Sequence, residues 1–158
     1  MHVDGRVLGR HAGIVNFTVG QRRGLGVAAG KPLYVVGLDP ERREVRVGPR
    51  EALAVRRIRI GDVNWLGDTA LSESVARELS VHVRVRSTRP PQPARLCAAT
   101  SGIELELVDS EEGVAPGQAC VIYEGPAPRA RVLGGGTIRV SVGTAREKAL
   151  RTELHAAF

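Results

Sequence analysis

The 158-residue chain is poor in cysteine and has no long apolar run, and each of these absences excludes a class of protein. Two cysteines, Cys97 and Cys120, are too few for a disulfide framework or a four-cysteine zinc site. We therefore expect two reduced, structural thiols in a cytoplasmic protein. No apolar stretch approaches the ~18–20 residues that cross a bilayer, and the first residues lack the apolar core of a secretory signal. The sequence thus predicts no membrane partner.

Familiar catalytic and nucleotide-binding motifs are also missing. The chain contains no His-Glu-x-x-His, Cys-x-x-Cys or Gly-x-Ser-x-Gly. Gly24–Gly26 and Gly134–Gly136 lack the Lys-Ser/Thr pair of a Walker loop and the context of a dinucleotide fingerprint. His11 has no nucleophile or carboxylate near it in sequence, which favours a hydrogen-bonded loop histidine over a general base. We predict no catalytic residue, no metal site and no cofactor in this chain.

Acidic residues are scarce at the N-terminal end. Residues 1–60 carry 12 Lys and Arg against 5 Asp and Glu, residues 61–140 carry 8 against 10, and residues 141–158 carry 3 against 2. The net charge of +6 therefore arises in the first part of the chain. A basic domain is typical of nucleic-acid binding because each neutralised phosphate releases counterions, although basic surfaces also serve solubility alone.

What the sequence has in abundance is short strand patterns. Alternating or β-branched runs bounded by turn residues occur at 31–38, 44–48, 57–60, 63–66, 81–86, 94–99, 103–108, 118–123 and 131–142. The first two predict a hairpin, and the others predict the five to seven strands of a small β-barrel. We expect Gly134–Gly136 to break the last strand, and Ser72–Leu79 fits either a turn of helix or a loop. Thr144–Glu147 resembles a capping box, which predicts a C-terminal helix.

The cleanest alternation is Val81–Arg86. It places three valines on one face of a strand and His82, Arg84 and Arg86 on the other. Such a basic face can hold a phosphate backbone without reading bases. The solvated outer face of a barrel explains the same pattern, so both interpretations stay open.

The segment Gly9–Gly26 combines five glycines, three arginines, one histidine and one glutamine. Glycine is used where the backbone must turn with positive φ, and arginine offers a planar, charged fork that suits phosphate. The pattern predicts a polar loop presented to a large anionic partner.

Motifs in a fixed order carry a family resemblance along most of the chain. The stretches are Asp4–Gly9, His11–Gly13, Phe17–Gly26, Pro32–Val35, Val45–Gly48, Asp62–Leu66, Val83–Arg86, Val114–Ala119 and Gly134–Ile138. They resemble the bacterial tRNA-specific 2-thiouridylases, transferases that place sulfur on the wobble uridine of tRNA. The resemblance implies a mainly β fold: part of a small central domain in residues 1–60, a translation-factor-like C-terminal β-barrel in 61–142, and a helical tail in 143–158.

The resemblance also implies which residues contact tRNA. The family has an Arg-Tyr pair in a barrel strand and a glutamine in a Pro-Gly-Gln motif, and valine replaces the tyrosine here. The implied tRNA-binding residues are Arg84, Val85, Arg86 and Gln118. A second set is expected to line the side that faces the catalytic domain, namely His11, Gln21, Arg22 and Arg23.

The catalytic parts of that family have no counterpart in this sequence. The ATP-binding Ser-Gly-Gly-x-Asp-Ser loop is missing, and neither Cys97 nor Cys120 occupies the place of a catalytic cysteine. We expect a truncated or split protein that is catalytically incomplete, with ATP bound elsewhere in the full-length family. Its expected partners are tRNA and a separate catalytic domain or sulfur-relay protein. The alternatives are a stand-alone β-barrel that binds RNA or protein without enzymatic activity, and an inactive gene remnant.

Overall fold

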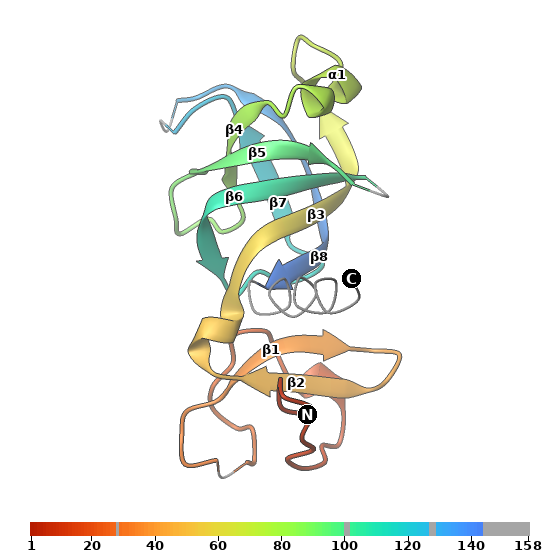
Figure 1. Cartoon of the computed structure of the whole chain (residues 1–158), viewed down its shortest axis with the longest axis vertical. Helices are drawn as coiled ribbons and strands as arrows, with labels where there is room; N and C mark the ends of the chain where they lie inside the picture. Colours follow the sequence, from red (N-terminus) through yellow and green to blue (C-terminus); the bar gives the residue numbers. More distant parts are fainter. Residues whose placement is uncertain (28, 100–101, 127–128, 144–158) are drawn as a thin grey trace, which may run out of the picture. The chain divides into compact units, whose positions relative to one another are not determined.

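The computed structural model describes residues 1–27, 29–99, 102–126 and 129–143. They belong to two compact units, Met1–Ala54 and Val55–Val142, which are drawn together in Figure 1. The helix expected after Thr144 lies outside the described residues. The sequence-based domain boundary at residue 60 lies inside a strand of the second unit.

The first unit is built on a β-hairpin, as the sequence predicts. Strands β1 (Tyr34–Asp39) and β2 (Glu44–Gly48) pair antiparallel around a small core of buried valines. A 3₁₀ turn, η1 (Ile14–Asn16), interrupts the long N-terminal segment. A second, η2 (Arg50–Leu53), follows the hairpin. The opening residues run beside β2, where the Val3 amide donates to the Val47 carbonyl at 2.9 Å.

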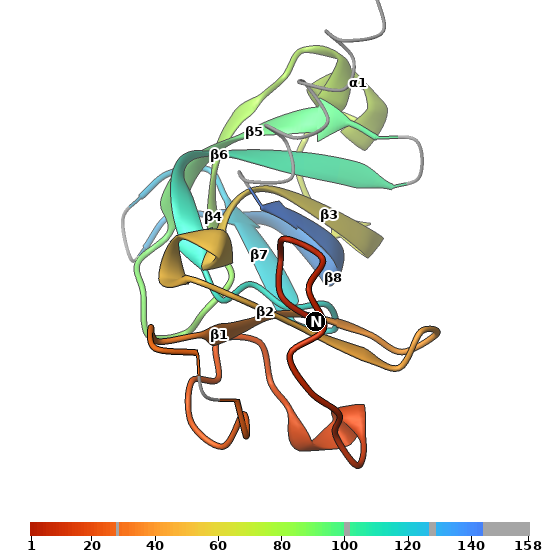
Figure 2. The same ribbon diagram turned by 60° about the horizontal axis from the view of Figure 1, so that its bottom comes forward.

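The second unit is a closed six-stranded barrel, which confirms the predicted barrel. Its elements are β3 (Ala54–Trp65), α1 (Leu71–Ala76), β4 (Ser80–Arg84), β5 (Gln92–Ala98), β6 (Ile103–Glu112), β7 (Ala119–Tyr123) and β8 (Val132–Gly143). Around the barrel the order is β3-β6-β5-β4-β7-β8, so that β7 lies between β4 and β8 (Figure 2). A closed barrel leaves no strand edge unpaired.

The barrel core follows from period-two alternation. In β4, Val81 and Val83 are each 1% exposed, whereas His82 and Arg84 between and after them are only half-buried. Because neighbouring strands in register turn the same face inward, Leu96, Leu105 and Ile122 join the valines in one apolar cluster. Apolar burial therefore fixes which side chains the barrel presents outward.

The expectation that Gly134–Gly136 breaks the last strand is wrong, since β8 runs through all three glycines. Here the backbones of adjacent strands approach too closely for side chains. An added Cβ at Gly134 would lie 2.4 Å from the Asn64 carbonyl oxygen, and one at Gly136 would lie 2.5 Å from that of Gly61. The glycines therefore close the barrel between β8 and β3.

Candidate nucleic-acid interface

The outer face of β4 and β7 carries the first candidate site. The two strands pair antiparallel, with His82 opposite Tyr123 and Arg84 opposite Val121. The Arg84 guanidinium carbon lies 5.6 Å from the centroid of the Tyr123 ring, which is within the range of a cation–π contact. The buried Arg84 Nε has no hydrogen-bond partner among the described residues. The arginine is thus held against an aromatic ring rather than in an ion pair.

A groove of about 660 Å³ begins at this pair. It is lined by Arg84, Val85, Arg86, Ser87, Thr88, Gln118, Ala119, Val121 and Tyr123. Residues from the end of β4 thereby meet residues at the start of β7, more than thirty positions later in the chain. The four residues implied as tRNA contacts all line this one groove.

Gln118 is placed by the turn that precedes β7. Gly117 has φ +87°, a conformation that favours glycine, and its amide donates to the Ile138 carbonyl at 2.8 Å. The Gln118 Oε1 accepts a hydrogen bond from the Ala115 amide at 3.0 Å. Because its oxygen is used in the turn, Gln118 has its Nε2 donors left for a ligand.

The Arg86 side chain is fixed by a hydrogen bond to the backbone beside the groove. Its Nη2 donates to the Gly113 carbonyl at 2.8 Å. The buried carboxylate of Glu111 accepts a hydrogen bond from Gln92 Nε2 at 2.8 Å and lies 3.2 Å from Arg89 Nη1. These contacts connect the stretch 86–92, whose residues 86–88 line the groove, to the end of β6.

Val85 differs from the other three implied contacts. Its side chain is 8% exposed and belongs to the barrel core. Val85 therefore contributes a small apolar surface at the edge of the groove and no side-chain hydrogen-bonding group. The aromatic ring that lines the groove is that of Tyr123, from the neighbouring strand.

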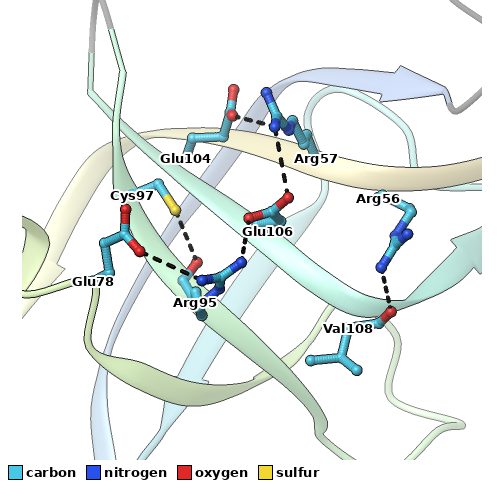
Figure 3. A network of polar contacts seen from close by, with 8 residues as sticks. All are labelled: Arg56, Arg57, Glu78, Arg95, Cys97, Glu104, Glu106 and Val108. Atoms are coloured by element: carbon cyan, nitrogen blue, oxygen red, sulfur yellow. Dashed lines mark hydrogen bonds and ion pairs between the residues drawn. The ribbon is translucent and has the colours of Figure 1, made fainter. Parts of the chain in front are cut away.

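The opposite wall of the barrel has arginines of a different kind. On β3, β5 and β6 the outward charges form an ion-pair network, shown in part in Figure 3. Arg95 lies 3.2 Å from Glu106 and 3.5 Å from Glu78, and Arg57 lies 3.6 Å from Glu106. Arg59 lies 3.3 Å from Glu104. Exposed pairs of this kind contribute only ~0–1 kcal/mol each, but they neutralise the charge of this wall.

The groove has no such compensation. None of the described residues that line it is acidic, and two of them are arginines. On the paired wall three arginines have glutamate partners and Arg56 donates to the Val108 carbonyl, whereas the arginines of the groove have no carboxylate partner among the described residues. Positive charge without a carboxylate partner attracts an anionic ligand more strongly than a paired arginine does.

The loop residues of the first unit fall into two groups. Gln21 holds its own loop, since its Oε1 accepts from the Thr18 amide at 3.0 Å and its Nε2 donates to the Arg23 carbonyl at 2.9 Å. His11 packs edge-on against Phe17, with ring centroids 5.4 Å apart. Arg22 and Arg23 are exposed. Gln21 therefore has both ends of its amide engaged within the loop, whereas the His11 Nδ1 has no hydrogen-bond partner among the described residues and the two arginines are open to a ligand.

A second hollow, of about 620 Å³, lies in this unit. It is lined by Arg22, Gly24, Leu25, Gly26, Val27, Lys31, Pro32 and Leu33. Gly24 and Gly26 have φ of +72° and +66°, which confirms the left-handed turns expected of this segment. The element that follows is β1, so no helix N-terminus is present to bind phosphates. The hollow therefore lacks the helix N-terminus on which many phosphate-binding loops depend.

Both thiols lack the environment of a reactive cysteine. Burial raises the pKa of Cys120 to about 12. Partial burial and the carboxylates of Glu106 and Glu78 raise the pKa of Cys97. Neither thiol is therefore an activated nucleophile in this unit. Over the described residues, no three His, Cys, Asp or Glu side chains gather as a metal site, and no helix is long and apolar enough to cross a membrane.

Two residues, Tyr123 in the groove and Glu111 at the end of β6, were not anticipated from the sequence. Tyr123 lies in an apolar strand run, and nothing in that run indicates which strand pairs with it. Glu111 follows an alternating stretch, where a carboxylate is usually exposed. The proximity of Tyr123 to Arg84 and the burial of Glu111 depend on pairing between distant segments.

Comparisons with known proteins assign a family to each unit. Residues 1–49 match the tRNA methyl transferase PRC-barrel domain, and residues 55–138 match the aminomethyltransferase beta-barrel domain. Three relatives are each named tRNA-specific 2-thiouridylase. The protein of Azorhizobium caulinodans is 60% identical over 87% of this chain. Those of Rhodopseudomonas palustris and Agrobacterium fabrum are each 59% identical, over 92% and 87% of it. The chain spans 35–36% of the length of these relatives.

Proposed function

Because the chain belongs to the tRNA-specific 2-thiouridylase family, as its middle and C-terminal domains, we propose that its barrel unit binds tRNA through the groove that starts at Arg84. One observation carries the proposal. The groove gathers arginines without carboxylates, whereas Arg57, Arg59 and Arg95 on the other described wall of the barrel are paired with glutamates. Phosphate binding depends on charge of this uncompensated kind.

Each polar residue of the groove has a separate task in this proposal. Arg84 supplies the charge that neutralises a phosphate, because no described carboxylate competes for it. Gln118 donates from Nε2 to an acceptor on the RNA, since its oxygen is held by the Ala115 amide. Arg86, tied to the Gly113 carbonyl, adds long-range attraction and holds the wall in place. Contacts of this kind fix the position and orientation of a folded RNA and carry little sequence information.

Sulfur transfer to tRNA, the activity in the relatives' names, is assigned to none of the described residues. The two thiols are not activated, and the hollow beside Gly24–Gly26 is followed by a strand and not by a helix N-terminus. We therefore propose that this part of the protein positions tRNA for chemistry performed by other groups of the full enzyme. The exposed Arg22 and Arg23 of the first unit are candidates for a further contact with the same anionic substrate.

Binding of an unmodified tRNA transcript to the 158-residue chain at a series of salt concentrations tests the proposal. Arg84→Ala should weaken binding and reduce the slope of log affinity against log salt by about one, since one phosphate contact is lost. Arg95→Ala is the matched control: it removes an arginine from the same barrel, but one already paired with Glu78 and Glu106.

The control should leave the salt slope unchanged. Equal effects of Arg84→Ala and Arg95→Ala would mean that overall charge and not the groove attracts the RNA. No measurable tRNA binding by the chain would favour the alternative of a barrel module with another partner.

A further inference from the structure

The groove is lined by more kinds of chemical group than a binding site for an anion alone requires. Apolar groups form one part of it, namely Val85, Ala119, Val121 and the ring of Tyr123. Hydroxyl and amide groups, from Ser87, Thr88 and Gln118, form another, beside the two arginines. A site for phosphate alone has no use for apolar surface. Apolar surface, hydrogen-bonding groups and positive charge together match the base, ribose and phosphate of a nucleotide.

The arrangement around Arg84 adds a flat surface to the groove. The guanidinium lies over the Tyr123 ring at 5.6 Å, and its Nε makes no hydrogen bond within the described residues. A guanidinium plane and an aromatic ring are the two protein surfaces on which unstacked bases pack. Bases inside a duplex are already stacked on each other and cannot use such a surface.

The strand neighbours of the pair leave this surface accessible. On β7, the outward residues beside Tyr123 are Val121 and Ala119, and on β8 the residue paired with Val121 is Gly135. Larger side chains at these positions would stand between the sheet and a ligand. The small residues let a planar group approach the sheet closely.

From these observations, and resting on the tRNA-binding function proposed above, we propose that the groove takes one unpaired nucleotide of the RNA, its base packed against the Arg84–Tyr123 pair. The phosphate of that nucleotide lies near the arginines, and Gln118 Nε2 donates to a base or ribose oxygen. The ligand is thus a bulged, loop or terminal nucleotide. A continuous paired stem reaches the arginines but not the ring.

Two RNA probes test this inference with the 158-residue chain: a short single-stranded oligonucleotide and a blunt-ended duplex of the same total number of nucleotides, in which every base is paired. Tyr123→Leu should weaken binding of the single-stranded probe about tenfold, because base–aromatic stacking is lost, and should change binding of the duplex little. The salt slope should not change, since tyrosine carries no charge. Tyr123→Phe, the matched control, keeps the ring and should bind both probes as the original chain does.

Arg84→Lys tests the second half of the pair. Lysine keeps the positive charge but loses the planar guanidinium, so the salt slope should be retained while the preference for the unpaired probe falls about fivefold. Thermal melting of each variant checks that the barrel is intact. If Tyr123→Leu melts early, Arg84→Lys still decides the question, because it keeps the charge and removes only the planar guanidinium.

The outcomes separate this inference from the function on which it rests. Equal losses for the two probes, or no loss for either with Tyr123→Leu and Arg84→Lys, would overturn the unpaired-nucleotide site. In that case a reduced salt slope with Arg84→Ala would still support tRNA binding by the groove. An unchanged affinity and slope with Arg84→Ala would refute both.

Discussion

Replacing Gly136 with alanine should destabilise the barrel more than the size of a methyl group suggests. Gly136 pairs with Cys120 of β7, and an added Cβ would lie 2.5 Å from the Gly61 carbonyl oxygen of β3. The same Cβ would lie 3.5 Å from Ile60 and from Val63 side-chain carbons. The closest neighbour is backbone and cannot rotate away, so a strand must move.

The size of the effect follows from that displacement. Inserting a methyl group into a well-packed site costs about 1–3 kcal/mol. Because the obstacle here is backbone, we expect Gly136→Ala to lower the free energy of unfolding by ~2 kcal/mol. For a domain of this size, that loss lowers the Tm by about 8–16 °C. Differential scanning calorimetry, which separates the two units if they unfold independently, is the assay.

Gly125→Ala provides the comparison within the same unit. A Cβ at Gly125 would meet its nearest heavy atom, Ala130 Cβ, at 3.9 Å, an ordinary contact. This variant should melt close to the original chain. A Gly136→Ala protein with an unchanged Tm would show that β3 and β8 do not approach each other as closely as the barrel requires, and the account of the triple glycine would fail.

Two further predictions concern buried polar groups. The pKa of Cys120 is raised from 9.0 to about 12 in the folded barrel, so the unfolded chain loses this thiol proton at a lower pH than the folded chain does. The stability that the protonated Cys120 contributes is therefore fully present below pH ~9 and is lost as the pH rises to ~12. Urea unfolding of the original chain should therefore show a steeper decline with pH than Cys120→Ala, and parallel curves would contradict the burial. Glu111→Ala should cost ~1–3 kcal/mol, because it leaves the Gln92 amide without its acceptor. Asp109→Ala, an exposed position of the same strand, should cost almost nothing by the same measurement, and equal losses would refute the structural role of Glu111.

Local patterns were enough to predict most strands. The alternation of Val81–Arg86 fixes which side chains of β4 face the core, because one face of a barrel strand must be apolar. The turn signals around residues 39–43 predict the hairpin of the first unit. The glycines of 134–136 were misread because a local pattern treats glycine as a strand breaker. Their reason is the proximity of other strands, which no local pattern contains.

The candidate site was also predicted from the sequence only in part. The family resemblance implied Arg84, Arg86 and Gln118 from the sequence, and the structure brings them into one groove. In the first unit, Gln21 uses both ends of its amide within its own loop and His11 packs against Phe17, whereas Arg22 and Arg23 are exposed. Only the atoms around a side chain decide whether its polar groups are already used.

The sequence by itself determined the mainly β fold, the family and the basic character of the chain, because these depend on alternation, motif order and composition. The tertiary structure decided which arginines keep an uncompensated charge. Pairing of β3 and β5 with β6 brings glutamates to Arg57, Arg59 and Arg95, and pairing of β4 with β7 brings a tyrosine to Arg84. Charge neutralisation depends on distances of a few ångströms between residues far apart in the chain, and those distances exist only once the barrel has closed.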